Sequence, residues 1–208
     1  RMALDGIFLY HLKNEIASFA VGSRVDKIHQ PSREELIFTL RSRAGSRKLL
    51  LSCRGDSARV HFTEFAPENP AKPPMFTMLL RKLLQGARLD AVEQQSLERV
   101  LKFHFTGTNE LGDKTRYTLI IEIMSRYSNI ILTDANEKII DAVRRITGEQ
   151  SSVRQILPGI LYVSPPPQNK LDIFTCSLDE VRQRLANSGK SAAKAVQDTL
   201  MGGSPIFC

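Results

Sequence analysis

Nine short runs with the residue types of β-strands, grouped as four and five, limit the folds open to this chain. Turn-forming pairs such as Pro31-Ser32 and Gly55-Asp56 separate the runs within each group. Parallel strands need crossovers of about a dozen residues or more, usually helical, so the sequence predicts antiparallel meanders. The expected strands are Val25–Gln30, Glu35–Ser42, Arg47–Ser52, Ala58–Thr63, Arg88–Glu93, Arg99–Phe105, Arg116–Met124, Asn129–Thr133 and Lys138–Arg144.

Three further segments have helical periodicity: residues 5–19, 75–86 and 178–200, the last divisible at Ser188-Gly189. Gly86 is a stop signal for the second helix. The apolar stripe of the first helix is expected to be Phe8, Leu12, Ile16 and Phe19. Together these elements predict an α+β fold, with antiparallel sheets and flanking helices.

The charge balance is basic, with 29 Lys and Arg against 22 Asp and Glu and a net charge of +7. Residues 72–88 contain four bases, Lys72, Arg81, Lys82 and Arg88, and no acid. A local excess of this kind suits a polyanionic partner, although an ordinary solvated helix surface has the same pattern. Lys72, Arg81 and Lys82 are therefore possible RNA contacts, as are Arg126 and Asn129 in the turn 125–129.

The cysteines Cys53, Cys176 and Cys208 are odd in number and widely spaced, which favours a reducing, cytoplasmic compartment. Cys53 follows a strand and precedes Arg54, so it is either a structural thiol or an activated one. The four histidines lack metal-ligand spacing, and no nucleotide-binding loop or nucleophile elbow occurs. No apolar run reaches the length of a membrane span. We therefore expect a binding module with no catalytic residues, metal or cofactor rather than an enzyme.

An acid–base pair, Glu98-Arg99, stands at the head of the run 99–105. The apolar residues of this run alternate, and strand parity places Arg99 on the same face as them. Burying an unpaired charge is costly, so Arg99 needs a partner or a solvated end. A strand-end salt bridge satisfies this need, and so does a polar site built on the sheet.

Glu122 raises the same question, because it lies within an apolar strand. It needs either a cation or a solvated face. By proximity in the sequence alone, Arg126 is the candidate partner.

Several segments, taken in order along nearly the whole chain, resemble the NFACT N-terminal domain of the RqcH/NEMF family, whose bacterial members are often called fibronectin-binding protein A. No segment is specific alone, but the set is. The matching segments are MALDGIFL (2–9), RVDKIHQP (24–31), RVHFTE (59–64), ENPAKPPMFTMLLRKLLQGARL (68–89), ERVL (98–101), IIEIMSRYSNIILTD (120–134) and SSVRQILPG (151–159).

The resemblance implies a fold similar to the N-terminal domain of MutM-type DNA glycosylases. It also implies a role in ribosome-associated quality control, with tRNA and the large ribosomal subunit holding a stalled peptidyl-tRNA as partners. Members of the family recruit a charged tRNA, alanyl in bacteria, for template-free tailing of the stalled chain. The ribosome performs the peptidyl transfer, so the domain itself is not an enzyme.

Three site residues carry over from this resemblance. Asp5 matches the acid of the family's helix-opening motif, and Glu98 with Arg99 matches an Asp-Arg pair at a strand start. Here the acid of that pair is Glu, one methylene longer. We expect Asp5 and Glu98 to orient Arg99, whose guanidinium suits a phosphate or a base edge. For Asp5, helix capping is the competing role.

Two other functions stay open. A DNA glycosylase of the similar fold would use an amino-terminal proline and glutamate, whereas this chain has Met2-Ala3-Leu4. A surface adhesin that binds fibronectin rests on the family's older name. Residues 1–175 are expected to form the α+β domain, and residues 176–208 a helix and the start of a truncated helix-hairpin-helix domain.

Overall fold

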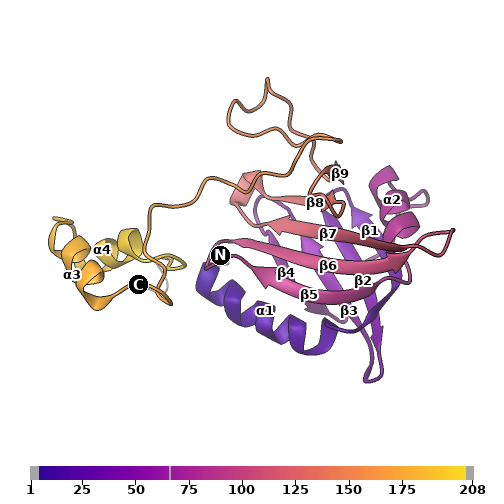
Figure 1. Cartoon of the computed structure of the whole chain (residues 1–208), viewed down its shortest axis with the longest axis horizontal. Coiled ribbons are helices and arrows are strands. Elements are labelled where there is room, and N and C mark those ends of the chain that lie inside the picture. Colours follow the sequence, from indigo (N-terminus) through magenta and orange to yellow (C-terminus); the bar gives the residue numbers. More distant parts are fainter. Residues whose placement is uncertain (1–4, 66, 205–208) are drawn as a thin grey trace.

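The structure, a computed structural model, describes residues 5–65 and 67–204. Within these residues, helices flank one nine-stranded sheet (Figure 1). The helices are α1 (Gly6–Ala20), α2 (Met75–Leu84), α3 (Leu178–Ala186) and α4 (Ala192–Thr199), with a short 3-10 helix η1 (Ser125–Tyr127). The strands are β1 (Arg24–Ser32), β2 (Glu35–Ser42), β3 (Gly45–Ser52), β4 (Arg59–Thr63), β5 (Arg88–Gln94), β6 (Val100–Thr108), β7 (Lys114–Glu122), β8 (Asn129–Thr133) and β9 (Ile139–Ala142).

The strands lie in the order β4-β3-β2-β1-β5-β6-β7-β8-β9, and every neighbouring pair is antiparallel. Within each group of strands, neighbours in the sheet are also neighbours in the chain, as a meander requires. The two meanders meet where β1 pairs with β5 through Arg24 and Arg88. The α+β class and the antiparallel meanders are confirmed, and the two meanders form one continuous sheet.

This sheet curls so that its two halves enclose the main hydrophobic core. Phe38 of β2 and Phe105 of β6 stack with ring centroids 6.2 Å apart, although β1 and β5 separate their strands in the sheet. Accordingly, β5, β6 and β7 lie in front of β1 to β4 in Figure 1. Each fully buried side chain of this size stabilises the fold by about 1.5–3 kcal/mol relative to exposure. Apolar side chains from both meanders thus hold the halves together.

Helix α1 packs against β5, β2 and β4, and α2 packs against β1 and β6. In α1, Leu9 and Ile16 are fully buried while Phe8 is 47 % exposed, so the expected stripe was wrong at Phe8. A spacing of seven residues keeps Leu9 and Ile16 on one face of the helix, and Phe8 falls beside that face. Helix α2 ends at Leu84, and Gly86 takes φ +80°, so the expected stop signal is confirmed.

A second, smaller core covers the opposite face of β7–β9, under the segment 144–163. Its members include Ile120 and Ile131, which alternate with side chains of the main core. Glu122 is 1 % exposed on this face. Its carboxylate accepts hydrogen bonds from Arg154 Nη2 at 2.7 Å and Tyr162 Oη at 2.8 Å.

Arg126 is therefore not the partner of Glu122. Its guanidinium lies 4.8 Å from the Tyr127 ring centroid and donates to the Tyr127 hydroxyl. Arg154 is distant in the sequence and reaches Glu122 only because the segment 144–163 folds back over the sheet. Burial of the phenol and the negative charge of Glu122 raise the pKa of Tyr162, so its hydroxyl stays protonated and donates.

The chain then leaves the sheet and forms α3 and α4, which pack against each other (Figure 1). Ser177 and Glu180 form a capping box at the start of α3. Gly189, at φ +60°, lies between the two helices, so the expected break at Ser188-Gly189 is confirmed. The domain division at residue 175 stays a prediction, and residues 205–208 of the second segment lie outside the described residues.

Candidate functional site

The turn between β5 and β6 contains Glu98 and Arg99 and is held against the start of α1. Leu97 is buried at its centre. Gln94 Nε2 donates to the carbonyl oxygens of Gly6, at 3.0 Å, and of Glu98, at 2.8 Å. One side chain thus joins the turn to α1 and fixes the position of Glu98.

The start of α1 approaches this turn closely. A Cβ atom on Gly6 would overlap the carbonyl oxygen of Leu97, so the contact requires glycine. Asp5 caps the helix, with its Oδ1 accepting from Phe8 N at 2.8 Å. Its capping role is thereby confirmed, and the same contact fixes its carboxylate beside the turn.

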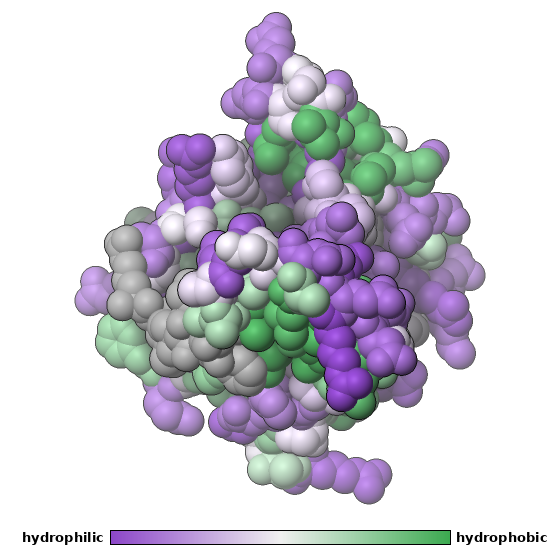
Figure 2. Space-filling view, turned by 90° about the vertical axis from the view of Figure 1, so that its left-hand side faces the viewer, coloured by the Kyte–Doolittle hydropathy of each residue, from purple (hydrophilic) through white to green (hydrophobic). Residues whose placement is uncertain are grey.

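The C-terminal segment completes this end of the molecule. Ile7 N donates to Gly202 O at 3.3 Å, and Ser96 Oγ donates to the carboxylate of Asp172. Figure 2 looks onto this end, where hydrophilic residues cover most of the surface and hydrophobic ones gather near the centre and the top. Residues from three distant parts of the chain therefore surround the β5–β6 turn.

Two cavities flank Glu98 and Arg99. The first, of about 230 Å³, is lined by Asp5, Glu98 and Arg99 together with Lys170 and Gln197. The structure thus brings the three expected site residues around one hollow. The second cavity, of about 280 Å³, lies beyond Arg99 and has a different lining. Glu98 and Arg99 are joined there by Lys102, Met124 and residues 164–168, which include three prolines.

Arg99 is one residue short of β6 rather than inside it, so strand parity does not place it in the core. Its carbonyl oxygen accepts from Ile123 N at 2.8 Å, which fixes its backbone. Among the described residues, the side chains of Glu98 and Arg99 form no ion pair with each other or with a third residue. The strand-end salt bridge is therefore not seen in this part of the chain, and the guanidinium is free to meet a ligand.

The basic helix offers fewer free cations than its sequence suggested. Arg81 is half-buried, and its Nε donates to Ile28 O at 2.8 Å, so this side chain ties α2 to β1. Lys72 and Lys82 are exposed. All three lie apart from the Glu98–Arg99 turn, since none of them lines either of its cavities.

The two possible RNA contacts in the turn 125–129 also differ in their exposure. Arg126 is exposed, whereas Asn129 is 1 % exposed. The Asn129 amide donates to Arg144 O at 2.8 Å and accepts from the backbone of Ile130 and Arg144. Asn129 is therefore a structural residue that joins β8 to the following segment, and we withdraw it as an RNA contact.

Burial raises the pKa of the Cys53 thiol to about 12, so Cys53 is a structural cysteine. Cys208 lies outside the described residues, as does Met2-Ala3-Leu4, where a glycosylase would have its nucleophile. Across residues 5–65 and 67–204, no three His, Cys, Asp or Glu side chains are grouped as a metal site requires. None of the described helices has both the length and the apolar composition needed to span a membrane.

Sequence reasoning missed the residues that build the walls of the site. Lys102, Lys170 and Gln197 line the two cavities and belong to no motif. Lys170 and Gln197 reach the site with the C-terminal segment, whereas Lys102 is placed by β6. Gln94 lines neither cavity but holds the turn against α1 from β5. The three prolines of residues 165–167 also line the cavity beside Arg99, and nothing in the sequence predicted that position.

Comparison with known proteins gives one family. Residues 5–208 match the family described as NFACT N-terminal and middle domains. The chain is 42 % identical to the Rqc2 homolog RqcH of Bacillus subtilis over 207 residues, which are 99 % of this chain and 36 % of that protein. It is 35 % identical to the ribosome quality control complex subunit NEMF homolog of Drosophila melanogaster over 115 residues, 55 % of this chain and 11 % of that protein.

A solved structure has the same fold. The N-terminal part of the fibronectin/fibrinogen-binding protein from Streptococcus suis superposes with a TM-score of 0.92 at 37 % identity. The superposition covers 99 % of this chain and 77 % of that one. The chain spans 36 % of the length of the first curated relatives.

Proposed function

This chain belongs to the NFACT N-terminal and middle domain family, and from that premise we propose that it binds tRNA and the large ribosomal subunit. Relatives in the same family are named for ribosome quality control. In the proposed role, the domain helps to recruit alanyl-tRNA to a subunit that holds a stalled nascent chain. It positions the tRNA for template-free tailing and performs no chemistry itself.

The observation that supports this proposal best is the setting of Arg99. Its side chain lines two cavities and has no ion-pair partner among the described residues. A guanidinium presents five N–H donors in a planar fork, which matches two phosphate oxygens or the acceptor edge of a guanine. Arg99 would therefore make the main contact to tRNA.

The neighbouring charges suit the same partner. The carboxylates of Asp5 and Glu98 accept hydrogen bonds, so they can meet the amino group of a base and restrict the positions of Arg99. Lys102 and Lys170, one in each cavity lining, add positive charge toward phosphates. Mixed acids and bases favour reading of a base over simple attraction of a polyanion.

Substitution of Arg99 by Ala tests the proposal. We expect the affinity for tRNA to fall by tenfold or more, because the donor fork is lost. The melting temperature should change little, since no ion pair among the described residues is removed. Arg99→Lys keeps the charge without the fork and should recover only part of the affinity.

Arg145 provides the matched control, because it is an exposed arginine paired with Asp141 on β9. Arg145→Ala should leave tRNA affinity unchanged. Glu98→Asp shortens the side chain by one methylene. A change in tRNA affinity in this variant would show that the length of the acid matters. Full tRNA affinity in Arg99→Ala, or a large drop in its melting temperature, would contradict the proposed role.

Fibronectin binding is the second candidate, because the Streptococcus suis neighbour is named for it. Retention of the chain on immobilised fibronectin, measured beside tRNA binding, separates the two functions. An adhesin should bind fibronectin with an affinity that Arg99→Ala leaves unchanged.

A further inference from the structure

Arginines form a row across the sheet at the end opposite Glu98. The strand register pairs Arg116 with Thr106, Thr106 with Arg88, Arg88 with Arg24, and Arg24 with Arg41. Residues directly opposite each other in antiparallel strands point to the same face. Four arginines of β7, β5, β1 and β2 therefore share one face along one line. With strands about 4.8 Å apart, the four steps from Arg41 to Arg116 span roughly 19 Å.

This row lies on the outer face of the curled sheet. The neighbours of its members in the chain, such as Leu40, Leu89 and Phe105, are buried in the core, so the arginines point away from it. Arg24, Arg41, Arg88 and Arg116 are all exposed. Of these four arginines, only Arg88 forms an ion pair with another described residue, Asp90, at 2.8 Å.

Lysines add to the row where α2 meets the sheet. A cavity of about 420 Å³ is lined there by Arg24, Lys82, Arg88 and Lys114. These four cations come from β1, α2, β5 and β7. The lining of the cavity contains no Asp or Glu. The hollow therefore concentrates positive charge from elements far apart in the sequence.

Stability alone disfavours this arrangement. Like charges directly opposite each other on a sheet destabilise it, and Arg24 faces an arginine on both sides. Arg24 Nη1 donates to Gly86 O at 3.0 Å, so its guanidinium is held in place rather than extended away. A bound polyanion would relieve this repulsion.

We propose that this arginine row and the cavity beside it bind the phosphate backbone of an RNA. Four exposed arginines on one line match a chain of phosphates, and they can contact it without reading a sequence. This proposal rests on the proposed function and adds a second RNA contact to it. The row carries no apolar residue that would favour a lipid surface instead.

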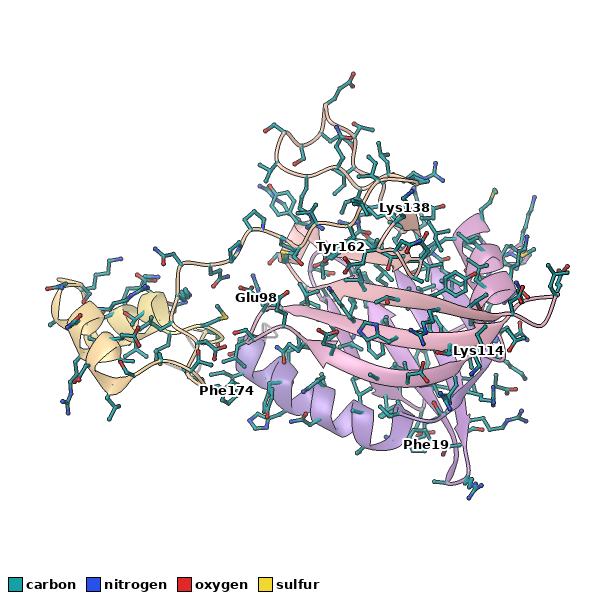
Figure 3. The ribbon with its side chains drawn as sticks, viewed as in Figure 1. Phe19, Glu98, Lys114, Lys138, Tyr162 and Phe174 are labelled. Carbon is teal, nitrogen blue, oxygen red and sulfur yellow. The ribbon has the colours of Figure 1, made fainter. Side chains whose placement is uncertain are left out.

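The location fits a long ligand. Figure 3 shows Glu98 and Lys114 at opposite ends of the sheet. Thr108, which pairs with Lys114, is ten residues from Glu98 along β6, a distance of roughly 30 Å. An RNA that reaches both sites would lie along the sheet, anchored at Arg99 and held by phosphates at the arginine row. The RNA is either the tRNA at Arg99 or the RNA of the large subunit.

The salt dependence of binding tests the inference. The double variant Arg41→Gln/Arg116→Gln removes the two ends of the row. Among the described residues, neither side chain forms a hydrogen bond or an ion pair whose loss would unfold the protein. The slope of log K against log salt should fall by about two in magnitude, one for each lost phosphate contact. Arg33→Gln/Arg145→Gln makes the same change in net charge elsewhere and should leave the slope unchanged. Titrations with tRNA and with large ribosomal subunits are run separately.

A smaller slope with tRNA alone assigns the row to the tRNA, and a smaller slope with subunits alone assigns it to ribosomal RNA. An unchanged slope with both, in a variant that melts like the wild type, overturns the inference. If Arg99→Ala abolishes tRNA binding in that case, the proposed function stands without the second contact. If the row variant weakens binding and Arg99→Ala does not, the row stands and the site at Arg99 fails. Wild-type protein that binds neither RNA refutes both.

Discussion

Replacing Arg154 by Met should destabilise this protein more than the loss of other ion pairs. Arg154 anchors the segment 144–163 to the sheet through Glu122, and the side chains of the two residues are 13 % and 1 % exposed. In the variant, the Glu122 carboxylate keeps only the hydroxyl of Tyr162 as a donor. A buried charge is then left without a counter-ion.

The magnitude follows from this burial. Removing one partner of a buried pair costs about 3–5 kcal/mol, whereas an exposed pair contributes less than about 1 kcal/mol. For a chain of 208 residues, each kcal/mol lowers the melting temperature by about 2–4 °C, so the expected loss is roughly 6–20 °C.

Urea unfolding and thermal melting, followed by circular dichroism, measure the effect. The matched control is Arg145→Met, which removes a 59 % exposed arginine from its pair with Asp141 and should cost no more than about 1 kcal/mol. The double variant Glu122→Gln/Arg154→Met should be more stable than Arg154→Met alone, because no buried charge remains. An Arg154→Met protein whose free energy of unfolding lies within about 1 kcal/mol of the wild type would show that Glu122 needs no cation.

Two further expectations follow from the same structure. Gly6→Ala should cost about 1–3 kcal/mol, because the new methyl group meets the Leu97 carbonyl, and it should also weaken tRNA binding by displacing the β5–β6 turn; a variant with unchanged melting and binding contradicts the close approach. In a Cys176→Ser/Cys208→Ser protein, the remaining Cys53 should stay unreactive toward iodoacetamide from pH 7 to 9, because the pKa of this thiol is about 12 and the side chain is buried; a rate that rises tenfold per pH unit to a plateau within that range would contradict it.

Local patterns predicted most of the elements. Alternation of apolar residues located the strands, with bounds displaced by a few residues, because side chains alone do not specify where pairing ends. Gly86 and Ser188-Gly189 predicted helix ends correctly, because a left-handed backbone there depends on glycine itself. Phe8 was wrongly assigned to the buried face of α1. Periodicity predicts that a helix has an apolar face, but it predicts less well which residue lies at the centre of that face.

Partners distant in the sequence were beyond such reasoning. Glu122 was correctly expected to need a cation, but nearness in sequence suggested Arg126 where the fold supplies Arg154. The salt bridge considered for Glu98 and Arg99 is not formed with any described residue, and β6 begins at Val100, one residue later than predicted. Asn129 looked like an exposed turn residue and is instead buried in the link from β8 to Arg144.

Local residue patterns and ordered motifs were enough to predict the class of the fold and the family, and they also nominated Asp5, Glu98 and Arg99 as candidate site residues. Tertiary packing brings these three side chains to one cavity, because the start of α1, the β5–β6 turn and the C-terminal segment meet there. The arginine row also depends on tertiary structure, because its members come from four strands and align only through the register of the sheet. Strand pairing and burial join residues that are far apart in the chain. A local sequence pattern therefore does not specify which residues come into contact.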